Sequence, residues 1–170
     1  GVGNSQIIHH GQSAFFAAGV ALGQTENNIQ YYWSSSQRKL KLNQKPIRRL
    51  AEYLGTLQTV VFCMEDLHLI KGSAKSRRRF LDLLLTQTQP GYLGILHRYT
   101  ESLRSRNALL KRHSPDMPLL DSFTKELIAT GQKLMNFRCQ LVKKLSPLVR
   151  LGYRKIAPEV EDARLDYKPS

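Results

Sequence analysis

The amino-acid sequence predicts an α+β fold in which an antiparallel meander of strands is followed by a lobe of long antiparallel helices. Up to about residue 42, apolar side chains recur at every second position, which is the period of a strand. From Glu65 onward they recur at every third or fourth position, which is the period of a helix. The two-residue period returns after Pro158, so we expect the chain to close in a strand.

Three alternating segments predict the meander, and we expect their apolar side chains to share one buried face. These side chains are Phe16, Ala18, Val20 and Leu22, then Ile29, Tyr31 and Trp33, then Leu40 and Leu42. Polar loops at 23–28 and 34–37 separate the segments. Short polar loops between alternating segments are typical of strands that turn back on their neighbours.

The region after the meander is expected to hold one helix and one more strand. A turn at 43–46 leads into the helix, which we predict from Pro46 to Leu54 because proline suits a first helical turn. Gly55 is suited to cap the end of this helix. The apolar run at 59–62 is then expected to be a short buried strand.

Four helices are predicted beyond this strand. They are a brief one through Leu67 and Ile70, a second at 74–87, a third at 92–111 and a long one after the loop at 113–118. Ser73 is suited to cap the start of the second helix, and Pro147 should kink the long helix or end it nearby. We therefore divide the chain into strands with a short helix at 1–62, a helical lobe at 63–157 and a closing strand at 158–170.

The chain is strongly basic. Its 26 Lys and Arg residues outnumber its 13 Asp and Glu residues, which gives a net charge of +13 and a pI near 10.0. The excess is uneven, because residues 38–112 hold 16 basic and five acidic side chains. A concentrated basic excess is typical of proteins that bind a polyanion, so we favour a nucleic-acid partner over a basic surface kept for solubility.

Several other classes of protein are not indicated. No stretch approaches the roughly 20 apolar residues of a membrane helix, and Cys63 and Cys139 form no zinc motif. We expect them to be free thiols in a reducing, cytoplasmic compartment. The sequence contains no phosphate-binding loop of the form GxxxxGK[ST], and its histidines lack metal-ligand spacing. The pair Glu65-Asp66 is better suited to stabilise a first helical turn than to share a proton. We therefore predict no catalytic residue, no cofactor and no metal for this chain.

The run Arg77-Arg78-Arg79 is the densest basic motif and a candidate DNA-binding site. Three consecutive helical residues fan over about 200°, so these arginines cannot all face one phosphate backbone. We expect one or two of them to point outward and one to support the interior. Asp82 lies four residues after Arg78, a spacing that permits an ion pair.

A second candidate DNA-binding site lies on the third predicted helix. Arg104, Asn107 and Lys111 are three and four residues apart, so they form one polar stripe, and Arg106 and Arg112 flank it. Such a stripe could bind phosphates by charge and by bidentate hydrogen bonds. An ordinary solvated helix face explains the stripe equally well.

Three runs near the middle of the chain carry a more specific signal. They are 60–67 with Glu65-Asp66, 69–73 with Lys71-Gly72, and 77–82 with the three arginines and Phe80-Leu81-Asp82. This block resembles the signature of the RecF family, and so do the run at 103–111, the strand before Asn43 and the closing residues 165–170. The resemblance extends from about Gly11 to the end. Met64 and Ala74 stand where the family usually has proline, which loosens two turns without removing a charge.

The resemblance implies a DNA replication and repair protein whose fold is a two-lobed, P-loop ABC/SMC-like ATPase head. In that family ATP joins two heads into a homodimer, which binds duplex DNA and junctions with single-stranded gaps. The dimer works with RecR and RecO to help load RecA. ATP and Mg²⁺ belong to the full-length family. Its P-loop would lie before Gly1, and its signature and Walker B motifs after Ser170, so this chain resembles the middle of a RecF protein and is predicted to be inactive as an ATPase.

Two hypotheses about function remain open at the level of sequence. The first is a fragment of a DNA-binding ATPase, with strands from lobe I and most of the helical lobe II. The second is a protein–protein interaction module that contacts RecR or a second head without touching DNA. The salt dependence of DNA binding would discriminate them, because direct phosphate contacts predict affinity that falls steeply with salt.

Overall fold

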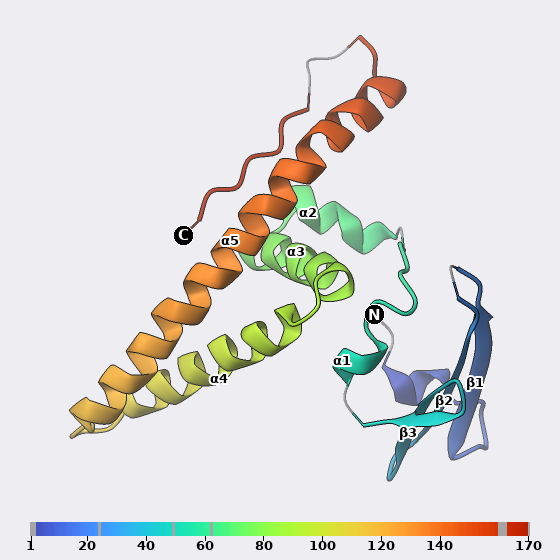
Figure 1. Cartoon of the computed structure of the whole chain (residues 1–170), viewed down its shortest axis with the longest axis horizontal. Helices are drawn as coiled ribbons and strands as arrows, with labels where there is room; N and C mark the ends of the chain where they lie inside the picture. The colour runs from blue at the N-terminus through green and yellow to red at the C-terminus, as the bar shows by residue number, and fades with distance from the viewer. Residues whose placement is uncertain (1–2, 24, 49, 62, 160–162, 170) are drawn as a thin grey trace. The chain divides into compact units, whose positions relative to one another are not determined.

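The computed structural model describes residues 3–23, 25–48, 50–61, 63–159 and 163–169 (Figure 1). The chain divides into two compact units, unit 1 at Gly1–Val60 and unit 2 at Val61–Ser170. Unit 1 contains the strands and unit 2 contains the long helices, which confirms the predicted order of the α+β fold. The assignment of 1–62, 63–157 and 158–170 to the lobes of an ATPase head stays a prediction.

Unit 1 is built on a four-stranded antiparallel sheet with the strand order β1-β2-β3-β4, which confirms the predicted meander (Figure 1). The strands are β1 (Ala14–Ala21), β2 (Asn27–Ser34), β3 (Arg38–Leu42) and β4 (Lys45–Ile47). A short 3-10 helix, η1 (Asn4–Ile7), precedes the sheet, and the single helical turn α1 (Leu50–Tyr53) follows it. Each strand pairs with the next along the chain, so the connections are short.

The register of β1 against β2 shows that the prediction of one shared buried face was wrong. Phe16 is paired with Tyr32, whereas Tyr31 is paired with Ala17. Paired residues of an antiparallel sheet lie on the same face, so Phe16 and Val20 lie on the face opposite Tyr31. Phe16 is 63% exposed and Val20 is 51% exposed. Alternation within one strand does not show which of its two faces aligns with the apolar face of the neighbouring strand, because a shift of one residue in the register exchanges the faces.

The two faces of the sheet differ in chemistry. One face, here called the tryptophan face, carries the rings of Phe15, Tyr31 and Trp33. The ring of Phe15 lies 5.7 Å from that of Tyr31 and 6.1 Å from that of Trp33 between centroids. The opposite face, here called the lysine face, carries Phe16, Ala18, Val20, Asn28, Gln30, Tyr32, Lys39 and Lys41. Phe16 and Tyr32 lie on the lysine face and take no part in the aromatic contacts of the tryptophan face.

The connection between β3 and β4 corrects the helix predicted from Pro46 to Leu54. Asn43 and Gln44 have φ angles of 51° and 68°, which is the backbone of a tight two-residue hairpin turn. The amide N–H of Asn28 donates to Oδ1 of Asn43 at 2.8 Å, which fixes this turn. Pro46 therefore lies in β4, a strand at the edge of the sheet, where its missing N–H is tolerated. Within the range predicted as helix, the described helical residues are those of α1.

Unit 2 contains a succession of helices that agree with the predicted ones. They are η2 (Met64–Leu67) with α2 (His68–Lys71), then α3 (Ala74–Thr88), α4 (Tyr92–Leu110) and α5 (Met117–Ile156). Asp116 caps α5 by accepting a hydrogen bond from the N–H of Leu119 at 3.0 Å. Helices α4 and α5 run antiparallel, side by side (Figure 1). The ring of Tyr99 packs against the backbone of α5 at Gly131, where an added Cβ atom would lie 3.3 Å from that ring.

The core of unit 2 lies where α3, α4 and α5 meet. Leu85, Tyr92 and Leu134 are 2%, 0% and 2% exposed, and each comes from a different helix. Ile95, Leu96, Tyr99, Phe137 and Leu141 pack against them. Burial of this kind stabilises by roughly 1.5–3 kcal/mol for each large side chain. The three helices therefore form one framework on which the basic side chains are mounted.

Two further expectations, and one alternative of a third, are corrected in or beside unit 2. The run at 59–61 is not a strand, and Phe62 lies outside the described residues. Residues 163–169 also form no strand: they run back alongside α5, which offers no free strand edge to pair with (Figure 1). Their alternation arises because Leu165 and Tyr167 face the helices while the residues between them are exposed. Of the two outcomes predicted for Pro147, an end of the helix is wrong, because α5 continues to Ile156, and a kink stays a prediction.

Candidate nucleic-acid interface

The predicted DNA-binding residues occupy two helices of unit 2 and differ in exposure. Arg77, Arg78 and Arg79 lie in the first half of α3, and Arg104 and Arg106 lie in the last two turns of α4. Lys111 and Arg112 follow directly after α4. Five of the seven side chains are exposed, and Arg78 and Arg106 are half-buried. The seven side chains therefore differ in how far they are available to a ligand.

The start of α3 commits Arg77 to the local backbone. Its guanidinium Nη1 donates a hydrogen bond to the carbonyl oxygen of Gly72 at 2.9 Å. Gly72 lies so close to the carbonyl group of His68 that a Cβ atom could not be accommodated there. Because Ser73 makes no side-chain cap to this helix, Arg77 is the side chain that links the turn to α3. Arg79 is exposed and has no polar partner among the described residues.

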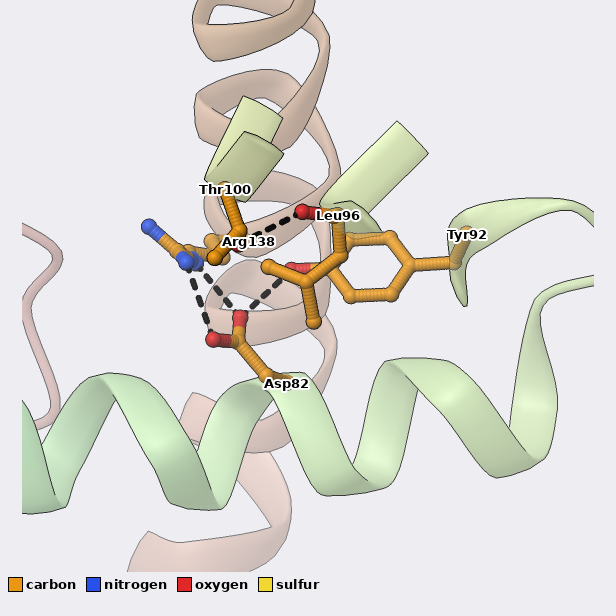
Figure 2. Close-up of polar contacts among 5 residues, drawn as sticks. All are labelled: Asp82, Tyr92, Leu96, Thr100 and Arg138. Atoms are coloured by element: carbon orange, nitrogen blue, oxygen red, sulfur yellow. Dashed lines mark hydrogen bonds and ion pairs between the residues drawn. The ribbon is translucent and has the colours of Figure 1, made fainter. Parts of the chain in front are cut away.

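Asp82 is held by a residue far away in the sequence. The guanidinium of Arg138 on α5 binds its carboxylate at two points, with Nε to Oδ1 at 2.8 Å and Nη2 to Oδ2 at 3.0 Å. The phenol of Tyr92 donates to the same Oδ1 at 2.5 Å. Figure 2 shows the carboxylate of Asp82 between the two partners. This cluster, here called the Asp82 cluster, joins α3, α4 and α5 in their shared core.

Burial and charge act together in the Asp82 cluster. The side chains of Asp82 and Arg138 are only 17% and 11% exposed. Burial by itself disfavours the charged guanidinium, but the hydrogen bonds and the charge of Asp82 outweigh it, so the pKa of Arg138 is raised overall. Burial raises the pKa of Tyr92 as well, and the hydrogen bond to Asp82 raises it further. Arg138 is thus a charged structural residue and is not available to a phosphate.

The polar stripe on α4 is divided in a similar way. Arg104, Asn107 and Lys111 are exposed, as the spacing predicted. The flanking Arg106 instead donates from Nε to the hydroxyl oxygen of Thr124 at 3.0 Å, which ties α4 to α5. Arg104, Lys111 and Arg112 have no hydrogen-bond or ion-pair partner for their side chains within the described part of the chain.

An open groove of about 1180 Å³ runs between these elements. Its walls come from α3, α4, α5 and the closing residues 165–168. Arg77 and Arg78 line it, together with Lys168 and the paired Arg138. Leu103, Leu127 and Met135 are among the side chains that form its apolar floor. Tyr167 lines the same groove as Arg138, so the closing segment lies beside the Asp82 cluster.

Sequence reasoning missed the basic half of α5. Between Met135 and Ile156 this helix has six basic side chains and no acidic one. They are Arg138, Lys143, Lys144, Arg150, Arg154 and Lys155. A long helical segment with six basic residues and no acidic residue is the sequence signal for this surface. Lys143, Lys144 and Lys155 are exposed, so they extend the basic surface of unit 2.

Two kinds of site find no support in the described ranges. No group of three His, Cys, Asp or Glu side chains in them could hold a metal ion. None of the helices described is both long and apolar enough to cross a membrane.

Curated relatives match most of this chain. It is 36% identical over 152 residues to the DNA replication and repair protein RecF of Synechococcus sp. (strain JA-2-3B'a(2-13)), which covers 87% of this chain and 40% of the relative. It is 38% identical over 141 residues to the same protein of Geobacter metallireducens, covering 83% of this chain and 38% of the relative. The chain thus spans about two fifths of the length of these relatives. No family model matches it.

A solved structure shares the fold. It is described as the recombination mediator protein RecF-ATPrS in the RecFOR pathway, and it covers 92% of this chain and 44% of its own. The TM-score is 0.84 at 24% sequence identity, a level at which the likeness shows the fold alone. The family is shown by the sequence matches to the RecF proteins. The chain therefore belongs to the RecF family.

Proposed function

We propose that this chain is the part of a RecF-type recombination mediator that binds duplex DNA through exposed basic side chains of its helical unit. The observation that supports it is the division of the arginines. Arg106 and Arg138 bind neighbouring side chains, whereas Arg104, Lys111 and Arg112 are exposed without such partners in the described residues. Between Ser102 and Pro115 the chain has four basic residues and no acidic residue, so this end of α4 attracts a polyanion.

The wider role follows the family. The full-length protein would bind duplex DNA and junctions between single and double strands as an ATP-dependent dimer, and would help RecO and RecR to load RecA. The phosphate-binding loop that such a cycle needs is absent from this sequence, so ATP and Mg²⁺ are assigned to the full-length protein. We therefore expect this chain to contribute DNA contacts and no catalysis.

The test is a titration of a labelled duplex with the 170-residue chain at several salt concentrations. Each phosphate contact should contribute about −0.9 to the slope of log affinity against log salt. The double variant Arg104→Glu, Lys111→Glu should therefore weaken binding on all sequences alike and flatten that slope by about two. An unchanged curve would remove the end of α4 from the interface.

A matched control lies on the same helix. Arg98 is exposed and forms only a long contact of 3.9 Å with Glu126. Arg98→Gln and Arg104→Gln each remove one positive charge from α4, so they alter the net charge equally. We expect only Arg104→Gln to change the salt slope. Equal effects would show that DNA responds to net charge and not to this site.

One observation favours the second hypothesis, an interaction module. Near its end α5 exposes large apolar side chains: Leu148 is 63%, Leu151 57% and Ile156 85% exposed. Apolar side chains gathered on a helix are typical of protein contact surfaces. If the chain binds no DNA at low salt but binds RecR or a second copy, and Leu151→Glu abolishes that contact, the interaction module is the better assignment.

A further inference from the structure

The lysine face of the sheet in unit 1 combines aromatic rings with positive charge. Phe16, Tyr32 and Lys39 form one row across β1, β2 and β3, because Tyr32 pairs with both of the others. The next row on the same face contains Gln30 paired with Lys41. Phe16 is 63% exposed, and the two lysines are exposed as well. A flat aromatic surface therefore lies next to two cations.

A shallow hollow marks this place on the sheet. It measures about 350 Å³, and its lining consists only of Phe16, Gln30, Tyr32, Gln37, Lys39 and Lys41. The four strands contain no Asp or Glu residue, whereas β3 and β4 contribute Arg38, Lys39, Lys41 and Lys45. The hollow therefore offers two rings, two amides and two ammonium groups, and its charge suits an anionic ligand.

The aromatic residues of the lysine face are not accounted for by packing within the sheet. The ring contacts described in unit 1 involve Phe15, Tyr31 and Trp33, all on the tryptophan face. A phenylalanine on a face that also carries two exposed lysines places apolar area in water. Aromatic side chains beside lysines on an exposed sheet are the arrangement with which proteins stack unpaired bases.

We propose that the lysine face binds single-stranded DNA. One or two bases would stack on Phe16 and Tyr32, and the phosphates would lie against Lys39 and Lys41. The amides of Gln30 and Gln37 can donate to and accept from base edges. Single strands suit this face better than duplex, because the bases of a duplex already stack on one another and hide their flat surfaces. The inference rests on the proposed function in taking DNA as the polyanion, and it adds the single-stranded side of a junction.

The test measures fluorescence anisotropy of a labelled oligothymidine of about 20 nucleotides, titrated with the whole chain. Phe16→Ala and Tyr32→Ala should each weaken binding about tenfold, since stacking on one ring contributes that much. Phe16→Trp, which keeps a flat ring, should retain the affinity. Lys39→Gln should weaken binding and flatten its salt slope by about 0.7.

The matched control is Lys45→Gln. Lys45 pairs with Leu42 and lies on the tryptophan face, so this variant removes the same charge from the same sheet on the other side. It should leave the salt slope for oligothymidine unchanged. If Phe16→Ala and Tyr32→Ala bind oligothymidine as the unaltered chain does, or if Phe16→Trp binds as weakly as Phe16→Ala, the lysine face is not a stacking surface.

Failure here can be told apart from failure of the proposed function. The duplex titration depends on Arg104 and Lys111 in unit 2, and Phe16→Ala should leave it unchanged. Loss of duplex binding in Arg104→Glu, Lys111→Glu with no effect of Phe16→Ala on oligothymidine would overturn the inference alone. An equal loss of duplex and single-strand affinity in Phe16→Ala would also overturn it, because stacking on unpaired bases predicts a selective loss.

Discussion

The contacts within unit 1 and the contacts within unit 2 join residues at very different separations along the chain. In unit 1 each strand pairs with its successor, and a two-residue turn at Asn43 and Gln44 joins β3 to β4. In unit 2 the pair between Asp82 and Arg138 joins residues 56 positions apart. The sheet is therefore joined through neighbouring segments, whereas the helices are joined through contacts between residues far apart in the sequence.

The same difference separates the basic residues into two groups. In unit 2 an arginine can act as a cross-link: Arg138 binds Asp82, and Arg106 binds Thr124 across 18 positions. In unit 1 the exposed lysines of β3 point away from the aromatic contacts of the sheet. Charge counted along the sequence therefore mixes side chains that hold the fold with side chains that are available to a ligand.

The largest expected effect comes from breaking the Asp82 cluster. Asp82→Ala should lower the free energy of unfolding of unit 2 by about 3–5 kcal/mol, because it leaves the buried charge of Arg138 without an anion. Urea unfolding followed by far-UV circular dichroism, which reports the helices, measures this loss. Replacing both partners, as in Asp82→Ala with Arg138→Met, should recover much of it, since no charge then remains buried.

The control for this prediction is an exposed ion pair between α4 and α5. Glu126→Ala removes the partner of Arg98, whose side chain is 58% exposed, and should change stability by about 0–1 kcal/mol. Losses of similar size in Asp82→Ala and Glu126→Ala would show that the buried Asp82 cluster stabilises unit 2 no more than an exposed ion pair does.

A smaller effect is expected from Tyr92→Phe. This change keeps the ring, which is fully buried, and removes the hydrogen bond to the charged Asp82, so stability should fall by about 1.5 kcal/mol. The variant isolates the polar contact between the helices, because it removes the hydroxyl and leaves the packing volume nearly unchanged.

The same tyrosine predicts a dependence on pH. Its pKa is raised in the folded chain above the value near 10 of the unfolded chain. The folded state then holds a proton that the unfolded state loses, so this contribution is complete below about pH 10 and is lost as the pH rises further. Above that pH the stability of the unaltered chain should fall more steeply than that of Tyr92→Phe. Parallel curves would contradict the raised pKa.

Local features of this molecule could be predicted from the sequence, and long-range ones could not. The meander and the three long helices follow from periodicity, which each segment carries by itself. The partner of Asp82 does not: spacing suggested Arg78, whereas the ion pair in the structure reaches Arg138 on another helix. No local pattern shows which distant guanidinium will be buried beside a given carboxylate.

Errors in the sheet have another cause. The alternation of Phe16 with Val20 predicts a strand correctly but does not predict its face, because a one-residue choice of register decides which face is buried. Pro46 was read as a helix start, although the backbone of Asn43 and Gln44 turns the chain into another strand first. The closing residues alternate because helices cover one side of them, and alternation alone does not require a partner strand.

The smallest effect tests the local side of the comparison. Gln44 has a φ angle of 68°, which disfavours any residue with a Cβ atom, whereas glycine accepts it. Gln44→Gly should therefore stabilise unit 1 by about 0.5–1 kcal/mol. The chain has a single tryptophan, Trp33, in β2, so its fluorescence during urea unfolding reports the sheet and not the helices.

Ser35→Gly is the matched control for this turn. It introduces glycine into the loop before β3, where the backbone has no positive φ angle, and should therefore destabilise unit 1 slightly. If the turn acts locally, Gln44→Gly moves the Trp33 transition and leaves the helical signal where it was, while Asp82→Ala does the reverse. A shift of both signals in either variant would mean that the two units unfold as one. The difference between local and long-range contacts would then apply to the structure of the two units but not to their stability.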